Sequence, residues 1–167
     1  MNWFAILITV LVLAMMIGPV MLLQPNKRQK RLAQLRTRAA QLGLHVKMAK
    51  FENESIAVYE KPWNLSEKQK SKIVEWRLQK MSYEHDIHVA KYWQLTSERP
   101  LPESIKDSLQ DWLERLPEGV QGIEVTRLGA RCYWNEMGGL QTLESLQVWL
   151  TEFANFMVPY ISRPSID

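Results

Sequence analysis

The first apolar stretch of the chain covers residues 3–23 and contains no charged side chain (WFAILITVLVLAMMIGPVMLL). A helix of this length reaches across the roughly 30 Å hydrocarbon core of a bilayer, so we predict an N-terminal transmembrane helix. No early basic segment and no small-x-small cleavage site accompany it, which favours a retained anchor over a cleaved signal peptide. The expected membrane-facing residues include Trp3, Phe4, Leu11, Met16 and Leu23.

Basic residues follow this stretch before any acidic residue appears. They are Lys27, Arg28, Lys30, Arg31, Arg36 and Arg38. Lys and Arg close to a membrane span stay on the cytoplasmic side. We therefore predict a single-pass protein of the cell inner membrane, with its N-terminus outside and the remaining chain in the cytoplasm. The same residues are candidates for contact with the headgroups of an anionic lipid bilayer, unless their only role is to set the orientation.

Beyond the apolar stretch, Leu32, Leu35, Ala39 and Leu42 recur at helical spacing. This spacing predicts a short basic amphipathic helix that ends at Gly43. Apolar and polar positions then alternate, which predicts two strands at residues 44–51 and 55–60, joined in a hairpin.

The pattern of residues 62–82 is ambiguous. Asn64 and Glu67 have the spacing of a capping box that begins a helix, whereas Val74, Trp76 and Leu78 alternate as in a strand. We favour a polar turn followed by a strand. The β-branched and aromatic residues of the segment 89–95 then predict a fourth strand.

The C-terminal third has clearer periodicity. Apolar residues between positions 101 and 116 follow a helical spacing that ends at Pro117. Residues 122–134 predict two strands about a turn at Leu128 and Gly129. The last predicted helix takes Thr142 as its N-cap and ends before Pro159.

This order of elements predicts an α+β domain in which two amphipathic helices cover one face of a mostly antiparallel sheet. About 120 residues are enough for one such domain. The predicted organisation is a transmembrane anchor, a basic juxtamembrane helix, a cytoplasmic α+β domain and a tail, at residues 1–24, 25–43, 44–160 and 161–167.

Charge is divided unevenly along the chain. Residues 1–50 hold eight basic and no acidic residues, and residues 51–167 hold the remaining 13 basic residues against all 18 acidic ones. An acidic folded part without a basic stripe argues against nucleic acid as a partner. The lone Cys132 cannot form an internal disulfide, and we expect it to lie in the core.

Candidate chemistry is sparse. His85, Asp86 and His88 crowd together as metal ligands do. They lie between two predicted strands, where neighbouring residues point to opposite faces, and no third ligand can be assigned beside the two histidines. We therefore interpret the segment as a polar loop, and predict no metal, no cofactor and no enzymatic activity.

Six tryptophans fall outside the first apolar stretch, more than a small core usually contains. Most are expected in the core, but Trp and Tyr also concentrate binding energy at interfaces. The candidates for a protein interface are Trp63, Trp76 and Trp93.

The apolar stretch and the sequence MLLQPNKRQKR that closes it resemble the anchor and juxtamembrane segment of YajC, an accessory subunit of the bacterial preprotein translocase. The resemblance covers residues 3–38, and it implies an accessory role in that translocase. The layout as a whole is similar to small, uncharacterised single-span proteins of proteobacteria, which implies no activity.

Our leading functional hypothesis is a non-enzymatic interaction module. Its partner would be another membrane or cytoplasmic protein, or a second copy of the chain. The alternatives are the YajC-like accessory role and a small-ligand or metal-binding module or enzyme.

Overall fold

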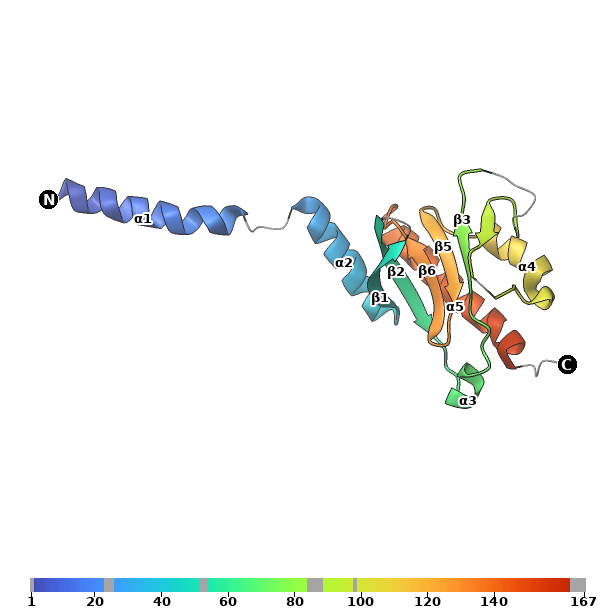
Figure 1. Cartoon of the computed structure of the whole chain (residues 1–167). Helices are drawn as coiled ribbons and strands as arrows, with labels where there is room; N and C mark the ends of the chain where they lie inside the picture. Colours follow the sequence, from blue (N-terminus) through green and yellow to red (C-terminus); the bar gives the residue numbers. More distant parts are fainter. Residues whose placement is uncertain (1, 23–25, 52–53, 84–88, 98, 163–167) are drawn as a thin grey trace. The chain divides into compact units, whose positions relative to one another are not determined.

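The computed structural model describes residues 2–22, 26–51, 54–83, 89–97 and 99–162, without the side chains of residues 16–22 and 162 (Figure 1). The chain divides into two compact units, residues 1–33 and residues 34–167. The first unit holds α1 (Trp3–Leu22) and the beginning of α2 (Lys27–Gln41). The second unit holds the end of α2 and all of the remaining elements.

The large apolar side chains that the structure places on α1, from Trp3 to Met15, are exposed. Within the described residues, no helix has both the length and the apolar character needed to cross a membrane. The predictions of a transmembrane helix, of a single-pass inner-membrane protein and of the orientation drawn from them are therefore wrong.

Helix α2 forms where the leucine spacing predicted a helix. Asn26 caps its N-terminus, since Asn26 Oδ1 accepts a hydrogen bond from the backbone N–H of Gln29 at 2.8 Å. Gly43 ends it with a φ of 74°, and the N–H of Leu44 donates to the carbonyl of Ala39 at 3.0 Å. This backward hydrogen bond across a left-handed glycine is the Schellman motif.

In the part of the chain that the structure describes, six strands form one sheet in the order β1-β2-β6-β5-β3-β4. All neighbouring strands are antiparallel, so the predicted small α+β domain with an antiparallel sheet is confirmed. Strands β1 and β4 lie at the two edges. The bounds are β1 (His45–Phe51), β2 (Glu54–Pro62), β3 (Trp76–Lys80), β4 (Trp93–Leu95), β5 (Val120–Val125) and β6 (Gly129–Trp134).

Helices α4 (Glu103–Glu114) and α5 (Leu140–Ser162) cover one face of this sheet (Figure 1). Helix α5 contacts β2 and β6, and α4 packs beside α5. At their contact the Trp149 Nε1–H donates to the carbonyl of Trp112 at 3.0 Å, and the Trp112 ring lies 5.5 Å from that of Phe153. Edge-to-face aromatic pairs of this kind join the two helices to one core.

The ambiguous segment contains both of the alternatives weighed for it. A one-turn helix, α3 (Glu67–Lys70), precedes strand β3. Its capping box joins Ser66 and Gln69, not the pair Asn64 and Glu67 of the helical alternative. The Gln69 side chain closes this turn, because its Oε1 accepts hydrogen bonds from the backbone N–H and the hydroxyl of Ser66 at 3.0 and 2.8 Å.

Helix α5 differs from its prediction at both ends. It begins at Leu140, so Thr142 lies inside the helix and is not its N-cap. It continues past Pro159 to Ser162. Burial of Met157 and Ile161 on either side of the proline offsets the lost backbone hydrogen bond.

Candidate functional site at the edge of the sheet

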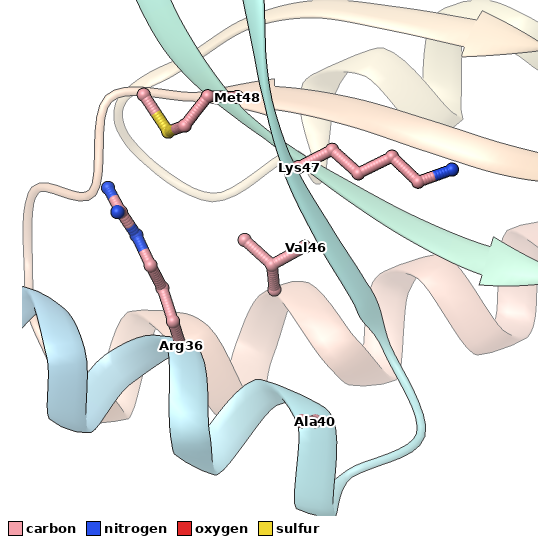
Figure 2. A pocket seen from close by; sticks show the side chains of 5 residues that line it. All are labelled: Arg36, Ala40, Val46, Lys47 and Met48. Carbon is pink, nitrogen blue, oxygen red and sulfur yellow. The ribbon is translucent and has the colours of Figure 1, made fainter.

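A groove lies between α2 and the edge strand β1. We call it the edge groove: it has a volume of about 240 Å³ and is lined by Arg36, Ala40, Val46, Lys47 and Met48. Figure 2 shows Val46 and Met48 on the α2 side of β1, whereas Lys47 points to the opposite side. This alternation follows from the two-residue period of a strand. The groove therefore has an apolar centre beside the guanidinium of Arg36.

Strand β1 is paired on one side only. Its residues pair with β2 from His45 opposite Glu60 to Phe51 opposite Glu54. Within the described residues, no backbone hydrogen bond joins the outer side of β1 to another segment. The N–H and C=O groups along such an edge can pair with a further strand. The edge groove thus lies directly beside a free backbone edge.

Glu136 holds the α2 wall of the groove in place. Arg36 Nε and Nη2 donate to its two carboxylate oxygens at 2.8 and 2.7 Å, and the Tyr59 hydroxyl donates to Oε1 at 3.0 Å. The hydrogen bonds with Glu136 raise the pKa of Arg36, although burial acts against them. Burial, and then the negative charge of Glu136, raises the pKa of Tyr59. Charge-assisted bonds in this two-pronged arrangement are strong and directional.

Glu136 reaches this position with a φ of 61°. A left-handed backbone is uncommon for a residue with a side chain and costs about 1–2 kcal/mol. Such strain persists only where surrounding contacts hold it. The hydrogen bonds to Arg36 and Tyr59 are those contacts, so the loop before α5 and the groove wall depend on each other.

The outer edge of β1 is positively charged and partly apolar. Lys47 and Lys50 are both exposed, and the Met48 side chain between them is 51% exposed. Within the described residues, neither lysine forms an ion pair. Their partners across β2 are Val58 and Ser55, which carry no charge. The positive charge of this edge is thus not neutralised by its own sheet.

The other face of the sheet carries a row of alternating charges that we call the charge ladder. The register places His45, Glu60, Arg131, Glu124 and Arg77 side by side on five neighbouring strands. Arg131 bonds to Glu60 and lies 3.2 Å from Glu124, while Arg77 lies 2.6 Å from Glu124. His45 Nδ1 is 3.7 Å from Glu60 Oε1. Opposite charges on neighbouring strands stabilise each other, so the ladder helps to hold the strands together.

Tyr133 extends this network toward β1. Its hydroxyl donates to Glu124 at 2.9 Å, and its ring lies 4.7 Å from that of Phe51. Burial, followed by the negative charge of Glu124, raises the pKa of Tyr133 to about 12. Burial would lower the pKa of Arg131, but the hydrogen bonds and charges of Glu60 and Glu124 outweigh it, and the pKa is raised.

The three tryptophans proposed for an interface are all buried. Their exposed fractions are 7% for Trp63, 1% for Trp76 and 6% for Trp93. The Trp63 Nε1–H donates to the carbonyl of Thr126 at 2.7 Å. Trp93 lines a cavity of about 410 Å³ beside α4. The structure places all three in the core, and their predicted interface role is untested.

The predicted metal ligands His85, Asp86 and His88 lie outside the described residues. Among the residues that are described, no cluster of three or more His, Cys, Asp or Glu side chains could hold a metal ion. Cys132 is buried, and burial raises the pKa of its thiol. The prediction of a core cysteine is confirmed. A buried thiol with a raised pKa is also a poor nucleophile.

The residues proposed for lipid contact fall into two groups. Exposed positions on α2 hold Lys27, Arg28, Lys30 and Arg31. By contrast, Arg36 is paired with Glu136, and Arg38 lies 3.5 Å from Glu144. The structure does not test their contact with headgroups. Of the proposed anchor residues, Trp3, Phe4 and Leu11 are exposed, and the side chains of Met16 and Leu23 lie outside the described part.

Sequence patterns alone did not reveal the edge groove or the charge ladder. Glu60, Glu124 and Arg131 do interrupt apolar strand patterns at matching positions, which was the available signal. Comparison with known proteins adds no further constraint: no family model, curated protein or solved structure matches the chain.

Proposed function

We propose that residues 34–167 form a non-enzymatic protein-interaction domain that takes up an extended segment of a partner along β1. The observation that carries this proposal is the free outer edge of β1 directly beside the edge groove. An added strand gains main-chain hydrogen bonds, and every second side chain enters the pocket next to it.

The dimensions of the two sheet edges favour β1 over β4. Strand β1 has seven residues and β4 has three, so β1 offers a longer row of backbone groups. The ion pair of Arg36 with Glu136 keeps the groove wall in place before a partner arrives, which lowers the entropy cost of binding. A single strand with one groove buries less than the roughly 1,600 Å² of a standard interface, so we expect weak and exchangeable binding.

Site-specific crosslinking in cells tests this proposal. A photoreactive phenylalanine analogue replaces either Met48 or Val148 in the full-length protein; both side chains are 51% exposed, and Val148 lies on α5. We expect a covalent adduct with a partner from position 48 and none from position 148. Ala40→Trp, which fills the edge groove, should abolish the adduct.

Thr37→Trp is the matched control, because Thr37 is exposed on the same helix and does not line the groove. It should leave the adduct unchanged. Equal crosslinking from positions 48 and 148, or an adduct that survives Ala40→Trp, would contradict binding along β1. The YajC-like role and the absence of enzymatic activity stay predictions.

A further inference from the structure

The strand edge also indicates which segment it takes up. We propose that the partner segment is acidic and alternates carboxylate side chains with apolar ones, an inference that rests on the proposed function. Side chains of an added strand alternate between the same two faces as those of β1. One set therefore lies over the edge groove beside Val46 and Met48, and the other lies on the face of Lys47.

The groove side selects apolar side chains. Val46, Met48 and the methyl group of Ala40 line its centre. The charge of the Arg36 guanidinium is balanced by Glu136, whose two carboxylate oxygens accept hydrogen bonds from Nε and Nη2. Covering the exposed Met48 side chain with a valine or isoleucine removes apolar surface from water.

Lys47 selects carboxylates. It lies opposite Val58 on β2, which carries no charge. A carboxylate on the same face of the added strand would lie next to its ammonium group, the position in which opposite charges on neighbouring strands stabilise each other. The nearby carboxylate of Glu60 is bound to Arg131 and does not compete for this lysine. Lys50 lies three positions further along β1, on the face of Val46 and Met48, so the carboxylates of an alternating strand do not face it.

The lysines of β1 argue against a second copy of the chain as the occupant. Two β1 strands side by side would bring Lys47 and Lys50 of both copies to one seam. Like charges on neighbouring strands destabilise the pair, and lysines on an edge strand are a common protection against self-pairing. Lys47 thus contributes both to edge protection and to the selection of an acidic partner.

Peptide binding to the full-length protein tests the inference. The probes are short fluorescein-labelled peptides with blocked ends, in which Val alternates with Glu, with Gln or with Lys. Fluorescence anisotropy reports binding, in a non-ionic detergent because α1 exposes apolar side chains that favour self-association. We expect the Glu peptide to bind about threefold more tightly than the Gln peptide and the Lys peptide to bind least.

Charge reversal provides the matched comparison. The variant Lys47→Glu should weaken the Glu peptide about fivefold and reverse the order of the Glu and Lys peptides. The control Lys68→Glu makes the same change of net charge at an exposed position in α3, and should leave the order unchanged. Circular dichroism of both variants verifies that the fold is retained.

The outcomes separate this inference from the proposed function. Equal binding of the Glu and Gln peptides, lost in Ala40→Trp, would overturn the acidic preference while supporting strand uptake. Failure of all three peptides to bind, or binding that Ala40→Trp does not affect, would overturn strand uptake as well. Dimers in analytical ultracentrifugation that Ala40→Trp disperses would identify a second copy as the occupant and overturn the inference.

Discussion

Arg36 and Glu136 lie 100 positions apart in the sequence and form an ion pair through two hydrogen bonds of 2.8 and 2.7 Å. The pair joins α2 to the loop that precedes α5. The Glu136 side chain is 8% exposed, so solvent screens the pair on the Arg36 side only. The wall of the edge groove is therefore positioned by a contact between distant parts of the chain.

Replacing Arg36 should loosen this wall. Arg36→Ala leaves the Glu136 carboxylate with the Tyr59 hydroxyl as its remaining partner, and we expect the free energy of unfolding to fall by about 1–2 kcal/mol. Urea denaturation followed by tryptophan fluorescence measures the change. Arg31→Ala removes an exposed charge from the same helix and should have little effect. Equal losses in the two variants would show that the ion pair does not stabilise the domain.

The stability of the domain should depend on the charge ladder most strongly at Glu60, its most buried residue. Arg131→Ala leaves the Glu60 side chain, 4% exposed, without its main cation, and should cost about 3 kcal/mol of unfolding free energy. Arg77→Ala should cost less than about 1 kcal/mol, because Arg77 is more exposed and Glu124 keeps Arg131 and Tyr133. Adding Glu60→Gln to Arg131→Ala should recover part of the loss. No recovery would mean that the buried charge is not the cause.

Stability should decline at high pH through Tyr133. Its pKa is raised to about 12, whereas a tyrosine in the unfolded chain titrates near 10. As the pH rises through this window the unfolded chain loses the proton first, so the folded state loses stability between about pH 10 and pH 12. Tyr133→Phe should lower stability at pH 8 and show a shallower decline above pH 10. Urea midpoints at several pH values measure both, and parallel curves would exclude Tyr133 as the group responsible.

Two buried tryptophans should respond differently to the same substitution. Trp63→Phe removes a hydrogen bond of 2.7 Å and leaves the Thr126 carbonyl without this donor. Trp76→Phe removes an Nε1–H that has no hydrogen-bond partner within the described residues. Since the loss of volume is the same, we expect Trp63→Phe to be more destabilising by about 1–2 kcal/mol. Thermal denaturation followed by far-UV circular dichroism gives the comparison, and the reverse order would contradict it.

Substitution by alanine should be more costly at one of two glycines with positive φ, Gly138, than at the other, Gly43. At Gly43 an added Cβ would have open space, with Lys61 Nζ at 3.9 Å, so Gly43→Ala should cost about 1 kcal/mol of backbone strain. At Gly138 an added Cβ would lie 1.9 Å from Thr142 Oγ1, so Gly138→Ala adds a steric clash to the same strain. We expect the larger loss of melting temperature at Gly138. A double variant with Thr142→Ala should reduce that loss, and no improvement would exclude the clash.

Local patterns predicted the helices and strands best where periodicity and a stop signal agreed. The leucine spacing before Gly43 predicted α2, and alternation predicted the hairpin of β1 and β2. The apolar stretch at the front of the chain predicted a helix, and α1 is present, but its predicted membrane crossing is contradicted. Helix formation depends on hydrogen bonds within the segment, so a local sequence pattern can predict a helix without information about its surroundings.

The sequence by itself therefore determined most of the secondary elements, though not α3 or the ends of α5, as well as the α+β class and the buried Cys132, because these depend on propensity and on hydrophobic period within short windows. Only the tertiary structure decided that β1 lies at an edge, that Arg36 bonds to Glu136 and that Glu60 lies between His45 and Arg131. Strand order, register and long-range ion pairs arise from segments far apart in the chain, whose relative positions are set by packing around a common core.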